Sequence, residues 1–244
     1  KVKYLHPMLE PILKNTHGIG IYQEQMMRIA RDLAGFTLAE ADTLRKAIGK
    51  KIKILLDSQK ERLIKGMTEN GIDQKTAKEI WELFPPFARY GFNRSHAACY
   101  ALIGYQTAYL KTHYPIEFMT GLLNADSGDT ERIAFLIHEA QKTGIKILPP
   151  DINKSFTNFI PEDGNDIRFG LLAIKNVGGN IIDAIIQERQ VGGPFTDFID
   201  FLTRIFHKDL NKKSLESLLK AGAFDSLNAD RGQLLTNIEE ILVF

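Results

Sequence analysis

The chain has 244 residues, of which 44% are hydrophobic and 25% charged, and its formal net charge is +1 at pH 7. These values are ordinary for globular proteins, so wholesale disorder is excluded, and the length predicts one or two domains. No run of about 18 apolar residues is present, which excludes a spanning helix. The first residues show no secretory pattern. The single cysteine, Cys99, excludes an internal disulfide and a cysteine-based zinc site. We therefore expect a cytoplasmic protein without membrane contact.

The charge is distributed unevenly. The segment from Arg45 to Lys65 contains eight basic and two acidic residues, whereas the residues from Ala223 onward include one basic and four acidic ones. A basic half beside an acidic tail indicates a polyanionic partner on one part of the surface. The alternative is an ordinary solvated helix face, and composition leaves both open.

The first 145 residues predict helices. Thr37 and Glu40 form a capping box, and glycines end several of the segments. The expected helices are a short one opened by Pro11, 21–34, 37–48, 52–70, one capped by Asp73 and ended by Pro85 and Pro86, one from Ser95 to about 113, one opened by Pro115, and 130–143.

The pattern changes at Ile145. Residues 145–148 are β-branched and precede two prolines, and 156–160 and 167–170 flank a turn-forming segment, which predicts a β-hairpin. We expect a domain boundary near 148–156. Further helices are predicted at 180–189, 195–205, 212–221 and 231–243. The expected fold class is mainly α, with a short β-hairpin at the junction between a multi-helix domain and a smaller helical one.

Several kinds of catalytic site have no counterpart in the sequence. There is no phosphate-binding lysine loop, no GxGxxG and no pair of aspartates at D-x-D spacing. His96 and Cys99 are three residues apart on one predicted helix, but two ligands do not make a metal site. We therefore expect neither a metal nor a catalytic residue within this chain.

The first candidate site is a basic cluster at the end of the third expected helix. Its members are Arg45, Lys46, Lys50 and Lys51. Cations at a helix C-terminus balance the helix dipole, which explains two of them. Four in a row favour a triphosphate or a nucleic-acid backbone as the partner.

The second candidate site is the start of the helix expected from Ser95. Asn93, Arg94 and His96 crowd this N-terminus, where free N–H groups favour an anion. Tyr100 lies four residues after His96 and shares its face. This face could stack on a base and bind its phosphates. The alternative is a capped helix with a core tyrosine.

The third candidate site is a Val-Gly-Gly turn between two apolar helical stretches. The turn comprises Lys175, Asn176, Val177, Gly178, Gly179 and Asn180. Its glycines permit positive φ and close approach, so its N–H groups could bind a DNA phosphate. This pattern resembles the helix-hairpin-helix motif. The segment 210–225 could be a second copy, in which Lys212 and Lys213 suit a phosphate but the double glycine is missing.

Taken together, these segments resemble the alpha subunit of bacterial DNA polymerase III, a C-family replicative polymerase. The matching stretches occur in the family's order: 2–25 (especially Tyr22-Gln23-Glu24-Gln25), 44–51, 90–100, 147–153, 173–178 and 221–225. The resemblance implies a fingers domain at 1–150, a tandem helix-hairpin-helix DNA-binding domain at 155–228, and a C-terminal helix at 229–244 that leads to an absent downstream domain.

The resemblance also implies roles for the three sites. The basic cluster and Asn93, Arg94, His96 and Tyr100 would bind the incoming deoxynucleoside triphosphate. The hairpin residues 175–180 with Lys212 and Lys213 would hold the primer–template backbone. The family commonly has arginine at Lys46 and lysine at Arg94, so both departures keep the charge but change its geometry.

The family's catalytic aspartates and their Mg²⁺ lie in the palm, upstream of this segment. The resemblance therefore implies a piece of a DNA-directed DNA polymerase that is inert alone, needs no cofactor of its own, and meets other replicase subunits through regions outside it. The start at Lys1 rather than at methionine favours a piece of a longer protein. A stand-alone, non-enzymatic DNA-binding protein that uses the helix-hairpin-helix unit as an anchor is the alternative.

Overall fold

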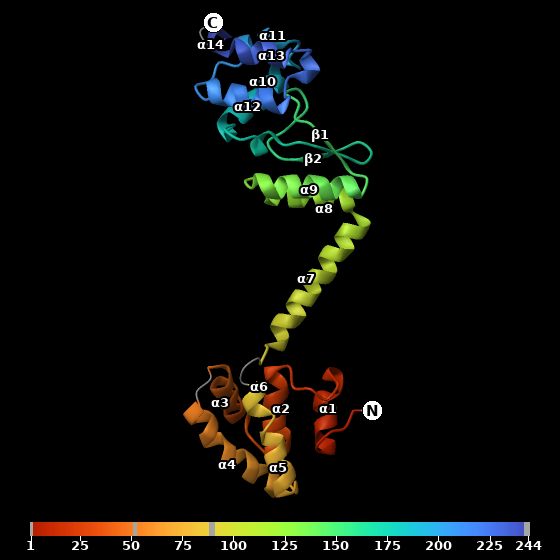
Figure 1. Cartoon of the computed structure of the whole chain (residues 1–244), viewed down its shortest axis with the longest axis vertical. Coiled ribbons are helices and arrows are strands. Elements are labelled where there is room, and N and C mark those ends of the chain that lie inside the picture. The colour runs from red at the N-terminus through yellow and green to blue at the C-terminus, as the bar shows by residue number, and fades with distance from the viewer. Residues whose placement is uncertain (1, 51–52, 88–90, 242–244) are drawn as a thin grey trace. The chain divides into compact units, whose positions relative to one another are not determined.

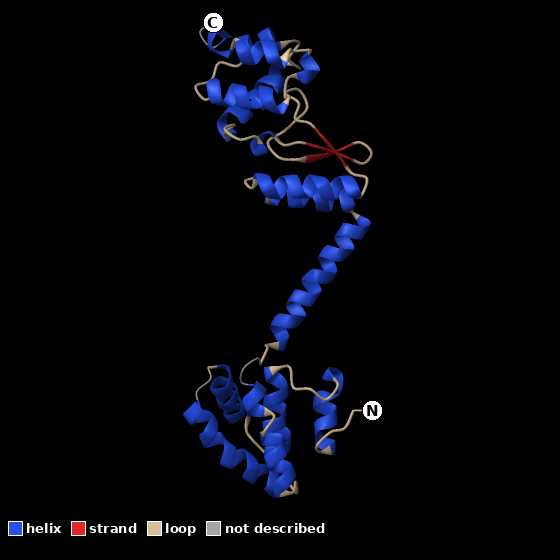
Figure 2. Ribbon diagram, in the orientation of Figure 1, coloured by secondary structure: helices blue, strands red, loops and turns tan. Residues whose placement is uncertain are grey.

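The computed structural model describes residues 2–50, 53–87 and 91–241. The chain divides into two compact units, Lys1–Tyr105 and Gln106–Phe244, and the division falls within helix α7 (Arg94–His113). Helices dominate both units (Figure 1; Figure 2), which confirms the mainly α fold class. The domain ranges given above stay predictions.

The first unit is a group of helices around one apolar core. Its elements are η1 (Pro7–Leu9), α1 (Glu10–Leu13), η2 (Lys14–Thr16), α2 (Gln23–Ala34), α3 (Leu38–Gly49), α4 (Lys53–Glu69), α5 (Gln74–Trp81), α6 (Phe84–Phe87) and the first part of α7. Fully buried apolar side chains from α2, α4 and α5, such as Ile29, Leu63 and Ile80, meet in this core.

The predicted helix ends are confirmed where the capping chemistry is local. Thr37 and Glu40 form the expected capping box at α3, with N–H···O distances of 2.9 and 3.3 Å. Gly35 ends α2 with φ of 69°, a left-handed conformation that favours glycine.

Gly66 sets how closely α4 approaches the end of α2. A Cβ atom added to Gly66 would lie 2.1 Å from the carbonyl oxygen of Ala34. The two backbones can therefore meet here only because residue 66 has no side chain.

Two expected boundaries in this unit are wrong. Helix α5 ends at Trp81, not at the prolines, because a tight turn follows in which the Leu83 N–H donates to Ile80, and this lets the rings of Trp81 and Phe84 stack 5.5 Å apart. Pro85 and Pro86 occupy the first turn of α6 instead, where a missing N–H costs little. The cap of α7 is Asn93 rather than Ser95, since Asn93 Oδ1 accepts from the His96 N–H at 2.9 Å.

The second unit begins with two helices on one face of a small sheet (Figure 1). These are α8 (Pro115–Ala125) and α9 (Thr130–Lys142), and the strands are β1 (Lys146–Leu148), β2 (Ile160–Glu162) and β3 (Asp166–Arg168). The sheet order is β1-β3-β2, with β1 parallel and β2 antiparallel to β3. Side chains of both helices and the sheet share one apolar cluster, including Leu123, Leu136 and Ile167.

The expected hairpin turn is confirmed, but the strands around it are shorter than predicted. Glu162 pairs with Asp166 across the turn, whereas 156–159 lies outside the sheet. The carbonyl groups of Phe156 and Thr157 accept from Leu171 and Leu172 instead, so they are already engaged beyond the strand.

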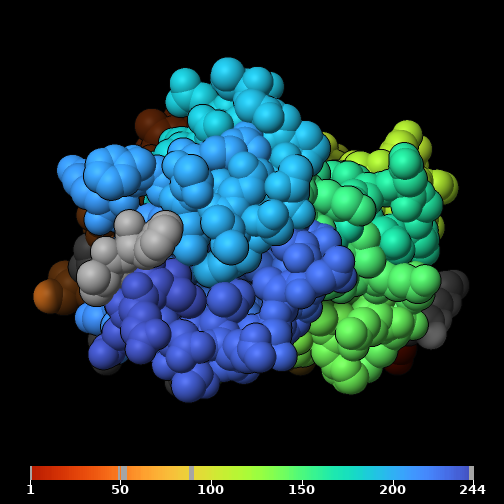
Figure 3. All heavy atoms as spheres, turned by 90° about the horizontal axis from the view of Figure 1, so that it is seen from above, coloured from red at the N-terminus to blue at the C-terminus, as the bar shows by residue number. Residues whose placement is uncertain are grey.

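The rest of this unit is a compact helical cluster. Its elements are η3 (Leu171–Ala173), α10 (Gly179–Gly192), α11 (Phe198–Arg204), α12 (Lys212–Ala221), η4 (Asp225–Leu227), α13 (Arg231–Thr236) and α14 (Ile238–Ile241). Buried aromatic and aliphatic side chains such as Phe201, Phe224, Ile182 and Leu218 fill its core. In the space-filling view this body lies against the green residues of the first part of the unit (Figure 3), and Phe169 packs against both cores.

Two helix predictions in this cluster are wrong. The stretch before the Val-Gly-Gly turn forms only the short η3, because Asn176 takes a left-handed φ of 65° close behind it. The predicted helix 231–243 is split at Asn237; the Thr236 hydroxyl bonds back to the Gly232 carbonyl at 2.8 Å, a competition typical of threonine near helix ends. Val243 lies outside the described residues.

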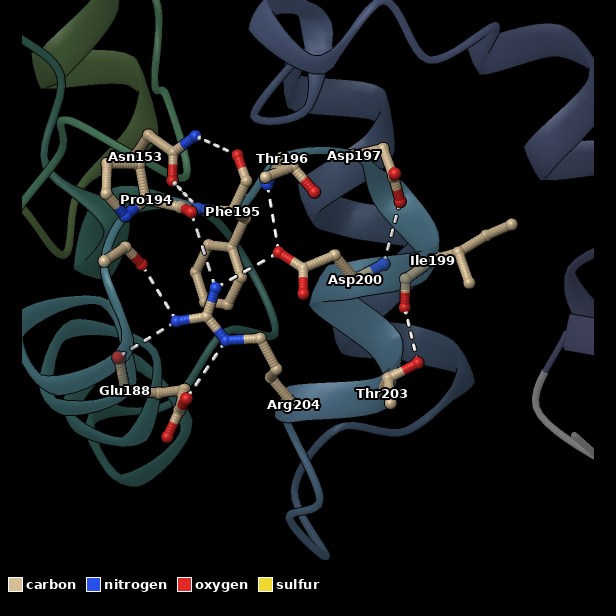
Figure 4. A network of polar contacts seen from close by, with 11 residues as sticks. Asn153, Glu188, Pro194, Phe195, Thr196, Asp197, Ile199, Asp200, Thr203 and Arg204 are labelled. Atoms are coloured by element: carbon tan, nitrogen blue, oxygen red, sulfur yellow. Dashed lines mark hydrogen bonds and ion pairs between the residues drawn. The ribbon is translucent and has the colours of Figure 1, made fainter.

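Arg204 joins the end of α10 to α11 (Figure 4). Its guanidinium forms ion pairs with Glu188 and Asp200 at 3.0 and 3.1 Å, and donates to the Gly193 carbonyl at 2.8 Å. It also lies over the Phe195 ring, 4.5 Å from the centroid. The segment that leads from α11 into residues 205–211 is thereby fixed to α10.

Candidate nucleic-acid interface

The basic cluster on α3 contains an internal counter-charge. Asp42 accepts from the Arg45 Nε at 2.8 Å and lies 2.9 Å from the Lys46 Nζ. The hydrogen bonds from Lys46 and Arg45 hold the pKa of the Asp42 carboxyl below its ordinary value. Lys50 is exposed, and Lys51 lies outside the described residues. The carboxylate therefore aligns two of the cations on one face while it offsets part of their charge.

The start of α7 is already occupied by a carboxylate. Both Glu24 oxygens, on α2, accept from the Arg94 N–H at 3.1 Å, and Asn93 takes the His96 N–H. The expectation that these N–H groups are free for an external anion is therefore wrong for Arg94 and His96. The exposed side chains are what this end of α7 offers a ligand.

Three exposed rings form a ladder that runs from Phe92, just before α7, to His96 and Tyr100 on the first turns of this helix. Phe92 and His96 have centroids 5.3 Å apart, and His96 and Tyr100 have centroids 4.5 Å apart. Tyr100 is 64% exposed and Phe92 46%, so the alternative of a core tyrosine is wrong in this structure. An exposed ladder beside the Arg94 guanidinium has the chemistry that stacks on a base.

The first hairpin presents an uncapped helix end. Val177 is buried in the core, whereas Gly178 and Gly179 are exposed and a Cβ at either would meet nothing within 4 Å. No side chain of the described residues caps α10, so the amides of its first turn face outward. Neither glycine has positive φ, so that part of the expectation is wrong; the left-handed residue is Asn176. Lys175 and Asn180 are exposed beside this turn.

The expected second copy, 210–225, contains α12, and the turn that meets the first hairpin is the one before this helix, residues 205–211, which we name the second hairpin. It differs from the first hairpin at the start of its helix. Asn211 caps α12 by accepting from the N–H groups of Lys213 and Ser214 at 3.0 and 3.2 Å. Lys212 is ion-paired with Glu239, which raises the pKa of Lys212, while Lys213 is exposed. The second copy therefore contributes side-chain charge rather than free amides.

The structure brings the two hairpins together. Asn176 Nδ2 donates to Ser217 on α12 at 3.2 Å, and Asn180 Nδ2 donates to Asp209 of the second hairpin at 3.3 Å. Among the described residues, no hydrogen bond or ion pair joins the basic cluster on α3 to the α7 ladder. The residues predicted to bind nucleotide thus form two groups, and those predicted to bind DNA form a third.

Sequence reasoning missed four residues of these sites. The spacing of Asp42 from Arg45 and Lys46 could have revealed the first, since residues three or four apart on a helix are neighbours. Phe92 precedes α7, so helical spacing does not reveal its contact with His96. Glu24 and Asp209 carry no such indication, because their partners are 70 and 29 residues away.

Two further features are absent from the residues that the structure describes. Residues 2–50, 53–87 and 91–241 contain no group of three His, Cys, Asp or Glu side chains that could hold a metal. Among the same residues no helix is both long and apolar enough to cross a membrane.

Two known protein families match parts of this chain. Residues 1–71 match the finger domain of the bacterial DNA polymerase III alpha subunit, and residues 144–234 match a helix-hairpin-helix motif. The chain thus contains a segment similar to the polymerase finger domain, followed by a segment similar to a helix-hairpin-helix motif.

Curated relatives give the particular protein that this arrangement resembles. The chain is 47% identical to DNA polymerase III subunit alpha of Thermus aquaticus over 96% of its residues. It is 44% identical to that of Borreliella burgdorferi over 99%, and 46% identical to that of Mycobacterium tuberculosis over 98%. It spans about a fifth of the length of each relative. The resemblance to the alpha subunit of bacterial DNA polymerase III is confirmed.

Proposed function

We propose that this chain is the nucleotide-side and DNA-holding segment of a replicative polymerase that makes DNA from deoxynucleoside triphosphates on a primed template. The observation that carries the proposal is the similarity to DNA polymerase III alpha subunits along nearly the whole chain. A cytoplasmic location, and other replicase subunits as partners of regions outside this segment, belong to the same proposal.

The nucleotide would meet the side chains of the first unit. Arg45, Lys46, Lys50 and Lys51 would neutralise triphosphate oxygens, for which arginine offers paired donors and lysine a point charge. The ladder of His96 and Tyr100, with Arg94 and Asn93, would line the nucleotide's position. The exposure of this ladder and the alignment of Arg45 and Lys46 by Asp42 support these roles.

The hairpins would hold the primer–template backbone. The outward amides at Gly178, Gly179 and Asn180 suit a phosphate oxygen, and Lys175, Lys212 and Lys213 add charge nearby. Such contacts position a duplex without selecting its sequence. The uncapped start of α10 supports this role.

Chemistry would be supplied from outside this segment. A DNA polymerase uses Mg²⁺ held by carboxylates, and the described residues hold no set of side chains that fits a metal. We therefore assign no metal ligand and no catalytic step to this chain.

A stand-alone DNA-binding protein is the second candidate, and the uncapped hairpin is the observation in its favour. It does not account for the finger-domain match over residues 1–71. A backbone anchor alone needs no separate basic cluster far upstream of its hairpin.

The basic cluster gives the direct test, in the full-length subunit with a primed template. Arg45→Ala should raise the KM for deoxynucleotide or lower kcat by about tenfold, since a hydrogen bond to a charged group is lost. Arg28→Ala is the control, because Arg28 is an exposed arginine paired with Asp32 on α2. If Arg45→Ala changes only the affinity for template, the cluster belongs to DNA.

A further inference from the structure

The contact between Glu24 and the start of α7 suggests a role for residues 22–25, which neither the nucleotide site nor the hairpins use. The starting observation is that Arg94, Ser95 and His96, at the start of α7, are all exposed. The contacts that the backbone of this first turn makes with residues 21–24 therefore help to set the direction of the ring ladder.

Residues 21–24 contact residues 91–94 side by side. The Phe92 N–H donates to the Ile21 carbonyl at 3.2 Å, and the Gln23 N–H donates to the Phe92 carbonyl at 2.9 Å, which forms a short parallel bridge. Gln23 Nε2 also donates to the Gly91 carbonyl at 3.1 Å. The first ring of the ladder, Phe92, is thus held through its own backbone.

Glu24 extends this bridge into the helix. Its two oxygens lie at equal distances, 3.1 Å, from the Arg94 N–H. A carboxylate at a helix N-terminus is stabilised by the helix dipole. The Arg94 guanidinium lies over the Tyr22 ring, 5.8 Å from its centroid, so main chain and side chain of Arg94 are both held by neighbouring residues of one segment.

The same segment is anchored on its other side. Gln25 is 5% exposed, and its Oε1 accepts from the N–H groups of Ile21 and Tyr22 at 2.9 Å. Its Nε2 donates to Thr16 Oγ1 at 2.7 Å. Residues 21–25 are therefore held by contacts within the first unit that do not involve α7.

We propose that Glu24 is a positioning residue for nucleotide binding: it fixes the first turn of α7 and thereby sets the Phe92–His96–Tyr100 ladder. This inference rests on the proposed nucleotide role of that ladder. In this proposal Glu24 acts only through its hydrogen bonds to the Arg94 N–H. The competing possibility is that its negative charge merely repels the triphosphate, and the two ideas predict opposite changes in KM.

The test uses the full-length subunit in single-nucleotide incorporation on a primed template. Glu24→Ala should raise the KM for deoxynucleotide by about fivefold or more, since a charge-assisted hydrogen bond is lost. Glu24→Gln, which keeps an acceptor oxygen, should recover most of that loss. Glu79→Ala and Glu79→Gln are matched controls, because Glu79 is an exposed glutamate of α5 in the same unit. A KM that falls in Glu24→Gln would overturn the proposal in favour of charge repulsion.

A double-mutant cycle with Tyr100→Ala separates positioning from a general loss of stability. If Glu24 acts through the ladder, Glu24→Ala should have little further effect on KM once Tyr100 is removed, because coupled residues are not additive. Fully additive effects would overturn the proposal. Should Tyr100→Ala leave KM unchanged while Glu24→Ala raises it, the nucleotide role of the ladder fails instead.

Amide hydrogen exchange of the full-length subunit gives a readout that is independent of activity. Glu24→Ala should increase exchange at residues 94–97 and leave α5 unchanged. Unchanged exchange at the start of α7 would show that Glu24 does not hold this turn, which also overturns the proposal.

Discussion

Single residues decide what each hairpin offers to a phosphate. The outward amides of the first hairpin remain accessible because Gly178 supplies no side-chain cap. In the second hairpin the same groups are taken by the Asn211 side chain. The side chain at one equivalent position therefore decides whether the first amides of the helix are open, as in α10, or hydrogen-bonded, as in α12.

Gly179, the first residue of α10, gives a prediction. Gly179 has ordinary φ and open space where a Cβ atom would lie, so Gly179→Ala should fold normally, with a helix gain of up to about 1 kcal/mol. In the full-length subunit, Gly179→Leu should weaken duplex binding at all sequences alike. The slope of affinity against salt should fall by about one phosphate.

Gly121→Ala on α8 is the control for this substitution, since nothing lies within 4 Å of the position its Cβ would take. A loss of binding confined to particular DNA sequences would contradict a phosphate-only contact.

At the scale of elements, the close approach of α2 and α4 at Gly66 makes a second prediction. Gly66→Ala should lower the free energy of unfolding of the first unit by about 1–3 kcal/mol, because the new methyl group meets the Ala34 carbonyl. Fluorescence of Trp81, the single tryptophan and a buried core residue of this unit, follows the transition. Gly121→Ala, measured by circular dichroism, should instead be neutral or stabilising, and equal behaviour of the two variants would show that the contact is not tight.

The sheet edge gives a pH prediction. Arg168 is 8% exposed and forms two hydrogen bonds to Glu162, at 2.7 and 2.8 Å, which lower the pKa of the Glu162 carboxyl from its ordinary 4.5. A lowered carboxyl pKa contributes stability above the unfolded-state value, and that contribution is lost as the pH falls through the folded-state value.

Hydrogen exchange in β3 should therefore accelerate as the pH falls below about 4.5, beyond the intrinsic pH effect on exchange. Glu162→Gln should lower the stability of the sheet at neutral pH by about 1–3 kcal/mol and remove this additional pH dependence. An unchanged pH profile in Glu162→Gln would mean that another carboxyl is responsible.

The sequence predicts these elements well where the cause is local. The capping box of Thr37 and Glu40, the end of α2 at Gly35 and the turn between β2 and β3 all depend on residues a few positions apart. The end of α5 differs from the expectation because the packing of Trp81 on Phe84 decides it. The cap of α7 differs because Asn93, not Ser95, accepts from the His96 N–H, and the sequence carries no indication of the added contact with Glu24, 70 residues away. Residue type identifies the candidate site residues, but nothing in the sequence identifies their partners at long range.

At the scale of the whole molecule, the prediction concerns how small a part of its relatives the chain covers. The described residues hold no metal-binding cluster, and the chain spans about a fifth of each relative. We expect the 244-residue chain to show no primer extension. An assay with labelled primer and Mg²⁺ checks this, with the full-length subunit as positive control; extension that co-purifies with the chain would contradict it.

The unequal hairpins have a mechanical consequence. All phosphates along a DNA duplex are chemically alike to the open backbone amides of the first hairpin. Binding through these amides therefore favours no particular position along the duplex. In the proposed role, only the open amides of the first hairpin must release one phosphate and take the next, because flexible lysine side chains such as Lys213 can follow the moving backbone. If the hairpins hold DNA as proposed, we expect a bound duplex to advance by single phosphate steps without leaving the protein.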